Sequence, residues 1–103
     1  MKIALIQIPL VWEDPKSNRA TIEQKINAIE SGTDLIVLPE MFTTGFTMQP
    51  ERVAETMGGE TIQWMQSLAK AKNAAITGSL IIVEEGKYYN RLVFVFPTGK
   101  IQQ

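Results

Sequence analysis

Two short apolar segments on either side of a helical pattern constrain the fold of this chain more than any other feature. Residues 2–7 (KIALIQ) and 34–38 (DLIVL) are continuous apolar runs, which are typical of strands buried on both faces of a sheet. Between them, Ile22, Ile26 and Ile29 recur at helical spacing. A strand, a helix and a second strand within about 35 residues predict a βαβ unit, so the two strands are expected to be parallel and close neighbours.

The helix of this unit has recognisable ends. Asp14 is a suitable N-cap and Pro15 is tolerated at the first helical position, although Ser17 is a competing cap. Gly32 is a natural place for the helix to stop. Packing the isoleucine stripe against the strands predicts one shared core, made of Ile3, Leu5, Ile22, Ile26, Ile29, Leu35 and Val37.

The residue pattern of the rest of the chain predicts an irregular segment, a second helix and a β-hairpin. Their expected ranges are residues 43–60, 60–72, and the pair 74–83 and 88–96. A short helical turn is expected at residues 52–57 of the irregular segment. The second helix carries an apolar stripe of Ile62, Met65, Leu68 and Ala69. Gly78 interrupts the third strand and marks either a bulge or a close approach of another part of the chain.

The fourth strand alternates between two faces and is rich in aromatic residues. One face is expected to hold Tyr88, Asn90, Leu92, Phe94 and Phe96. Such a strand left at a sheet edge is an aggregation hazard. The turn at residues 97–100 normally feeds a partner strand, which has barely begun at Ile101. This pattern favours a chain cut inside a larger domain, and the alternative is a frayed native C-terminus.

Composition excludes several classes of protein. The 103 residues suffice for one domain or part of one, and ten Lys and Arg residues oppose 11 Asp and Glu residues. This balance argues against nucleic-acid binding and against a polybasic membrane surface. No apolar run approaches the 18 or so residues of a membrane span, and no secretory signal pattern follows Met1. We therefore predict a cytoplasmic protein.

The chain contains neither cysteine nor histidine. Disulfides, Cys/His zinc sites and cysteine nucleophiles are therefore absent from these residues, as is Ser-His-Asp catalysis. Any catalysis by this chain alone has to use carboxylates, lysines or hydroxyl groups.

Glu40 is the main candidate for a catalytic role. It follows Pro39, two positions beyond a predicted buried strand, and precedes the apolar residues Met41 and Phe42. Ligands bind beyond the carboxyl ends of strands in sheets built from βαβ units, and a carboxylate there is a candidate general base. The alternative is a solvated or salt-bridged loop glutamate. Asn90 is either a solvent-facing residue or a hydrogen-bonding organiser.

Several segments together resemble the nitrilase or carbon–nitrogen hydrolase superfamily. The first strand, a helix that carries Asn18, and residues 34–40 resemble the start of its members. Residues 40–46 (EMFTTGF) are similar to the omega-amidase branch. Residues 77–79 (TGS), residues 89–90 (YN) and the turn at Gly99 fall where the family has its third and fourth strands. The resemblance covers the whole chain, but only about the first two-fifths of a typical member.

The resemblance implies an α+β fold, a four-layer α-β-β-α sandwich with mixed sheets, of which residues 1–103 would be the N-terminal part of a single domain. It also implies hydrolysis of carbon–nitrogen bonds by a Glu, a Lys and a Cys, with no cofactor and no metal. Glu40 matches the general base. The lysine would fall just past Gln103 and the cysteine later. Because they follow Glu40 closely, Phe42 and Phe46 are expected either to line the acyl pocket or to belong to the core. Asn90 is the candidate for a supporting residue of the site, unless it faces solvent.

We therefore expect the N-terminal segment of an omega-amidase-like enzyme that hydrolyses the terminal amide of a small dicarboxylate. Family members commonly associate, so the full-length enzyme is expected to be a homo-oligomer. Because Lys and Cys are missing, the 103-residue chain alone is expected to be inactive. The alternative is a non-enzymatic α/β fragment that binds or self-associates through its exposed fourth strand. A third hypothesis is a complementing chain whose partner supplies Lys and Cys.

Overall fold

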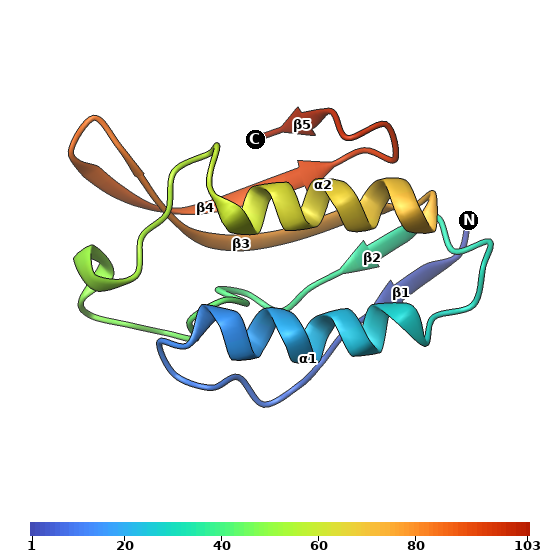
Figure 1. The fold of residues 1–103 in the computed structure, drawn as a ribbon, viewed down its shortest axis with the longest axis horizontal. Coiled ribbons are helices and arrows are strands. Elements are labelled where there is room, and N and C mark those ends of the chain that lie inside the picture. The colour runs from blue at the N-terminus through green and yellow to red at the C-terminus, as the bar shows by residue number, and fades with distance from the viewer.

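A single five-stranded sheet forms the framework of the structure, a computed structural model that describes residues 1–103. The elements along the chain are β1 (Ile3–Leu5), α1 (Pro15–Asn27), β2 (Leu35–Val37), the 3₁₀ turn η1 (Pro50–Arg52), α2 (Glu60–Lys72), β3 (Ala75–Glu84), β4 (Lys87–Val95) and β5 (Ile101–Gln102). The spatial order of the strands is β1-β2-β3-β4-β5 (Figure 1). Strands β1, β2 and β3 are parallel, whereas β4 and β5 are antiparallel to their neighbours.

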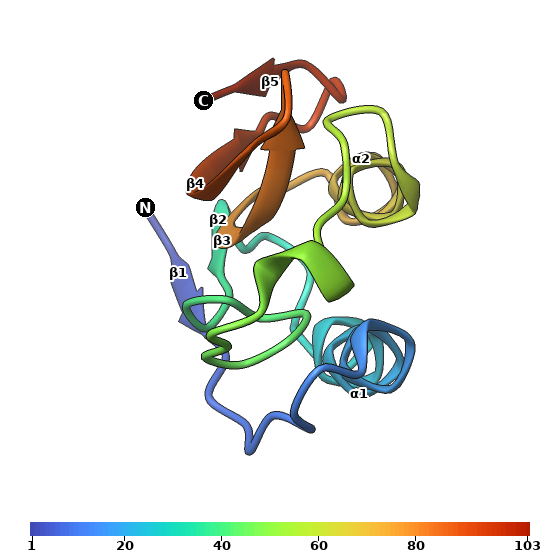
Figure 2. The same cartoon turned by 90° about the vertical axis from the view of Figure 1, so that its left-hand side faces the viewer.

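Both helices lie on the same side of the sheet, as the side view in Figure 2 shows. The fold of the chain is thus a mixed α/β arrangement of one helical layer and one mixed sheet. The predicted βαβ unit is confirmed, because β1 and β2 are adjacent and parallel. A second parallel crossover, from β2 through α2 to β3, follows it.

The start of α1 is as predicted, but its end is not. The Asp14 side chain accepts a hydrogen bond from the backbone N–H of Ser17 at 3.1 Å, and Pro15 is the first helical residue. The helix ends at Asn27, before the predicted stop at Gly32, because the N–H of Ala28 turns back onto carbonyls of the last turn. Gly32 instead adopts a φ of +90° in the turn that leads to β2.

The predicted core is wrong in its choice of strand residues. Ile22 and Ile26 of α1 are fully buried, as predicted, but they pack on the opposite strand face from the one expected. The core includes Ile36 and Ile76 of the sheet, together with Ile6 and Leu38, which follow directly after β1 and β2. The other face, here called the open face, carries Ile3, Leu5, Leu35, Val37, Thr77, Leu92 and Phe94.

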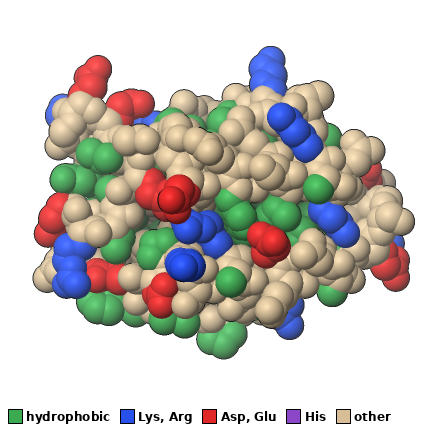
Figure 3. Space-filling view, in the orientation of Figure 1, with side chains coloured by type: hydrophobic (Ala, Val, Ile, Leu, Met, Phe, Trp, Pro, Cys, Tyr) green, Lys and Arg blue, Asp and Glu red, His purple; other side chains and the backbone are tan.

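The open face is only partly shielded from solvent, so β1 is not buried on both sides. Leu5 keeps 69% of its surface exposed and Leu92 keeps 65%. No helix of this chain covers these side chains (Figure 2). In contrast, the helical side presents acidic and basic residues interspersed with apolar ones (Figure 3).

The second helix and the hairpin match their predicted positions closely. Helix α2 spans the predicted residues, and its stripe of Ile62, Met65, Leu68 and Ala69 is buried. Strands β3 and β4 pair in register without a bulge from Ile76–Val95 to Glu84–Lys87. The turn between them has positive φ at both Glu85 and Gly86, as two-residue hairpins favour.

The segment before α2 differs from its prediction. The helical turn lies at Pro50–Arg52 rather than at residues 52–57. Proline fixes φ near helical values, which favours a turn that begins at Pro50. Glu55 is instead extended and pairs with Ile82 of β3 in an isolated parallel bridge.

Strand β4 is not a free edge along its whole length. It pairs with β3 throughout and with β5 at Phe94 and Val95. Neither helix has the length and apolar character needed to cross a membrane.

We predict that Ile26→Ala lowers the free energy of unfolding by about 2–5 kcal/mol, since Ile26 is fully buried between α1 and the sheet. Leu5→Ala on the open face is the matched control, with an expected change of about 0.5 kcal/mol or less. Chemical denaturation of both variants checks this. Equal losses for the two variants would contradict the assignment of the core to the helical side.

Candidate active site

Glu40 lies three residues beyond the end of β2, beside a pocket of about 370 Å³. The pocket is lined by Val37, Leu38, Glu40, Thr77, Gly78, Ser79, Asn90 and Leu92. The Glu40 side chain is exposed to solvent, but it stands in a concave setting at the carboxyl end of a parallel strand. This is the position at which sheets built from βαβ units bind ligands.

Asn90 of β4 is the polar partner of Glu40. Its amide Nδ2 donates a hydrogen bond to Glu40 Oε2 at 3.2 Å. Asn90 pairs across the sheet with Ile81, so its side chain projects from the open face. The structure therefore brings together two residues that lie 50 positions apart in the sequence.

The backbone beside Glu40 adopts an unusual conformation that Ser79 supports. Met41 has a φ of +49°, which non-glycine residues rarely adopt. The Met41 N–H donates to the Ser79 hydroxyl at 2.9 Å, and the Phe42 N–H donates to the Ser79 carbonyl at 3.2 Å. One residue of β3 thus binds two successive amides of the turn that carries Glu40.

The Phe42 ring is part of the hydrophobic core. It is fully buried, and it stacks on Trp64 of α2 with ring centroids 6.0 Å apart. A side chain on Gly78 would place its Cβ 2.9 Å from Phe42 Cδ1 and 3.0 Å from Leu38 Cβ. Of the two alternatives predicted for Gly78, a bulge or a close approach, the structure has the close approach. Phe42 lies in the core, which is one of the two roles left open for it.

Phe46 has the opposite environment. Its side chain is 73% exposed and lines a second pocket of about 250 Å³, together with Met41, Tyr88 and Asn90. The Phe46 carbonyl accepts a hydrogen bond from Trp12 Nε1 at 2.9 Å, which fixes its backbone. The Phe46 ring shares this pocket with Asn90. Contact between Phe46 and a substrate therefore stays a prediction.

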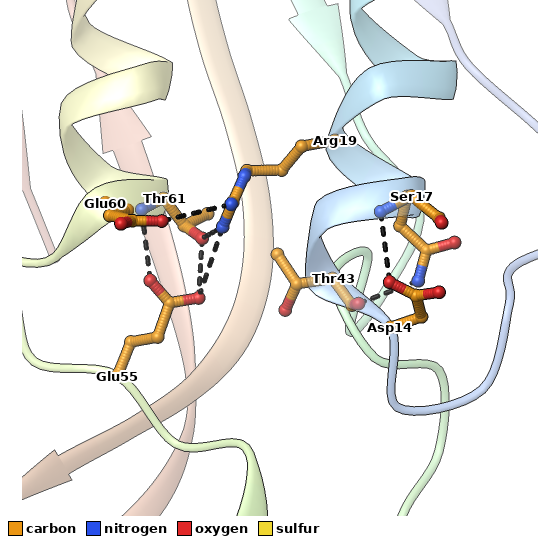
Figure 4. Close-up of polar contacts among 8 residues, drawn as sticks. Asp14, Ser17, Arg19, Thr43, Glu55, Glu60 and Thr61 are labelled. Carbon is orange, nitrogen blue, oxygen red and sulfur yellow. Dashed lines mark hydrogen bonds and ion pairs between the residues drawn. The ribbon is translucent and has the colours of Figure 1, made fainter.

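Residues 41–59 form a long segment whose start is anchored by Asn18. The Asn18 side chain is 1% exposed and donates from Nδ2 to the carbonyls of Val11 and Thr43, both at 2.7 Å. Its Oδ1 accepts from the N–H of Val11 at 2.8 Å. Figure 4 shows the Thr43 carbonyl next to the first turn of α1.

The end of this segment is anchored by Glu55. Its carboxylate accepts hydrogen bonds from the Thr61 N–H at 3.0 Å and from the Thr61 hydroxyl at 2.5 Å. Since Gly59 at the N-cap of α2 has no side chain, Glu55 takes over the capping role. Arg19 reaches across from α1 to Thr61 and to Glu60 (Figure 4).

Sequence reasoning did not assign roles to Ser79, Asn18 or Glu55. The only local signal for Ser79 is the glycine before it, which indicates a close approach in a strand. Asn18 binds Val11 and Thr43, and Glu55 binds Thr61. These contacts depend on how loops return to the helix ends, which no residue pattern at Asn18 or Glu55 indicates. His, Cys, Asp and Glu side chains form no group of three that could hold a metal ion.

Comparison with known proteins gives consistent matches over nearly the whole chain. Residues 2–103 match the carbon-nitrogen hydrolase family. The omega-amidase YafV of Escherichia coli is 39% identical over 102 residues, which cover 98% of this chain and 39% of that protein. An (R)-stereoselective amidase of Pseudomonas sp is 32% identical over 101 residues, covering 96% of this chain and 37% of that protein. The chain thus spans less than two-fifths of the length of these relatives.

The fold has a close counterpart among solved structures. XC1258 from Xanthomonas campestris, a CN-hydrolase superfamily protein with an arsenic adduct in its active site, superposes with a TM-score of 0.92. It is 37% identical, and the match covers 97% of this chain and 38% of that chain.

We predict that Gly78→Ala destabilises the protein by about 1–3 kcal/mol, because the added methyl group would collide with the buried Phe42 ring. Gly58→Ala is a suitable control, since nothing lies within 4 Å of a Cβ built there. Thermal and chemical unfolding of both variants provide the measurement. A Gly78→Ala variant as stable as the parent would show that the Phe42 ring is not packed tightly against Gly78 of β3.

Proposed function

The chain belongs to the carbon–nitrogen hydrolase family, and we propose that it is the N-terminal part of an amidase in which Glu40 is the general base. The observation that carries this proposal is the position of the Glu40 carboxylate, which lies in a pocket beyond β2 and accepts a hydrogen bond from Asn90. The omega-amidase name of the Escherichia coli relative supports a substrate class, the terminal amides of small dicarboxylates.

The proposed reaction needs a cysteine, which these 103 residues lack altogether, and a lysine, which the resemblance places beyond Gln103. The thiol transfers its proton to Glu40 while its sulfur attacks the amide carbon, and the lysine stabilises the resulting oxyanion. The carbon–nitrogen bond then breaks while the nitrogen takes the proton from Glu40. Ammonia is released, and the acyl group remains bound to the cysteine sulfur as a thioester. Water, deprotonated by Glu40, attacks the thioester to yield the carboxylic acid and to restore the thiol.

The open face supports the remainder of the proposed fold. In the proposed four-layer sandwich, a second sheet would pack on this face and cover Leu5 and Leu92, which are both mostly exposed. Residues beyond Gln103 would supply this sheet together with the lysine and the cysteine. The cytoplasmic location, the homo-oligomeric state and the lack of nucleic-acid or membrane partners stay predictions.

A non-enzymatic role is the competing hypothesis. The same exposed apolar side chains suit self-association or binding through the open face and β4. The two hypotheses differ at Glu40, because binding through the sheet does not require a carboxylate at that position. A third possibility, a partner chain that supplies Lys and Cys, makes the same demand on Glu40 as the amidase proposal.

In the longer protein that includes these residues, we predict that Glu40→Gln lowers the rate of ammonia release at least about 100-fold, since the amide cannot accept the thiol proton. The substrate is a small dicarboxylate monoamide. Glu85→Gln, in the exposed hairpin turn, is the control and should retain full activity. Undiminished activity of Glu40→Gln would rule out the general-base role.

The 103-residue chain alone should release no ammonia from the same substrate, because it contains no cysteine and no histidine. The purified chain is compared with its Glu40→Gln variant. Turnover that is well above background and is abolished by this substitution would refute the argument that the catalytic groups are incomplete.

A further inference from the structure

We infer that Ser79 is the positioning residue of Glu40. This inference rests on the proposed function, because it assigns Ser79 a role in the reaction for which Glu40 is the base. Ser79 lies on β3 and lines the same pocket as Glu40. Its hydroxyl acts on the peptide that joins Glu40 to Met41, not on the carboxylate itself.

The Glu40 carboxylate has little support of its own. Its side chain is exposed, and its one hydrogen bond is the 3.2 Å contact with Asn90. The direction in which the carboxylate points therefore depends mainly on the backbone that carries it. A general base has to reach its proton within hydrogen-bond distance, so this direction matters for catalysis.

That backbone is held in a conformation that it would not adopt freely. Met41 has a positive φ, and such residues persist only where the surrounding contacts impose them. The Met41 carbonyl accepts from the N–H groups of Thr44 at 3.2 Å and Gly45 at 2.8 Å. On the other side of the residue, the Met41 N–H has the Ser79 hydroxyl as its acceptor. Loss of this acceptor frees the Glu40–Met41 peptide to rotate.

The change from Ser79 to alanine is a narrow one. The residue is only 7% exposed, and it lines the pocket beside Glu40. An alanine at position 79 would keep the strand and the bond from the Phe42 N–H to the backbone carbonyl. It would remove only the bond to Met41.

The rest of the turn has independent anchors, which separates positioning from folding. Phe42 is buried in the core, and Asn18 holds the Thr43 carbonyl. We therefore expect that removal of the Ser79 hydroxyl leaves the segment in place but disorders Glu40. The effect should fall on catalytic turnover more than on substrate binding or on stability.

The test measures kcat and KM for ammonia release in the longer protein that includes these residues, with a small dicarboxylate monoamide as substrate. We expect Ser79→Ala to lower kcat about 10- to 100-fold and to change KM less than about threefold. Ser79→Thr keeps the hydroxyl and should retain at least about half of the activity. Ser67→Ala, on the exposed side of α2, is the control.

Hydrogen exchange provides a readout that does not depend on activity. The Met41 amide should exchange about 2- to 10-fold faster in Ser79→Ala, while the amides of the core strands keep their rates. An unchanged Met41 rate, an unchanged kcat, or a Ser79→Thr variant as impaired as Ser79→Ala would each overturn the inference.

Glu40→Gln in the same assay separates the two levels of the argument. If Glu40→Gln is inactive while Ser79→Ala keeps full kcat, only the positioning role of Ser79 fails. If Glu40→Gln is fully active, the proposed function itself fails, whatever Ser79→Ala does.

Discussion

Burial of the Phe42 ring is the interaction on which both the packing of the sheet and the position of Glu40 depend. The ring lies fully buried between Trp64 of α2 and the backbone of Gly78 in β3. Protein cores are close-packed, so a buried ring of this size cannot shift without moving its neighbours. The turn that carries Glu40 is therefore fixed to the same core that holds α2 on the sheet, and a change at Gly78 affects stability and site geometry together.

Local patterns in the sequence were sufficient to predict the helices, the parallel βαβ unit and the hairpin. They were not sufficient to predict which strand face meets the helices. In residues 34–38, Leu35 and Ile36 point to opposite faces and both are apolar, so either face satisfies the pattern. The expected core took Leu35 and the structure uses Ile36, because the crossover to α1 determines the covered face only in three dimensions.

The candidate site also has one part that the sequence could predict and another that it could not. Glu40 could be singled out because it follows a buried strand and Pro39, and the family resemblance gave it a role. The contact with Asn90 depends on the pairing of β3 with β4, and the contact with Ser79 depends on the pairing of β2 with β3. Neither pairing register is encoded next to Glu40 in the sequence. Contacts between neighbouring strands therefore had to come from the structure.

Glu40, Asn90 and the exposed apolar side chains share one side of the sheet. The cross-strand pairs Ile81–Asn90 and Ser79–Leu92 project away from the helices, toward the open face. Burial of apolar surface contributes about 25 cal/mol per Å², so a layer packed on this face would gain stability from Leu92 and its neighbours. The same layer would close the pocket around Glu40 and exclude water from it, which strengthens every electrostatic interaction there. In the proposed four-layer fold, covering the open face and completing the active site would thus be one event, and the solvent exposure of Glu40, the proposed general base, would end with it.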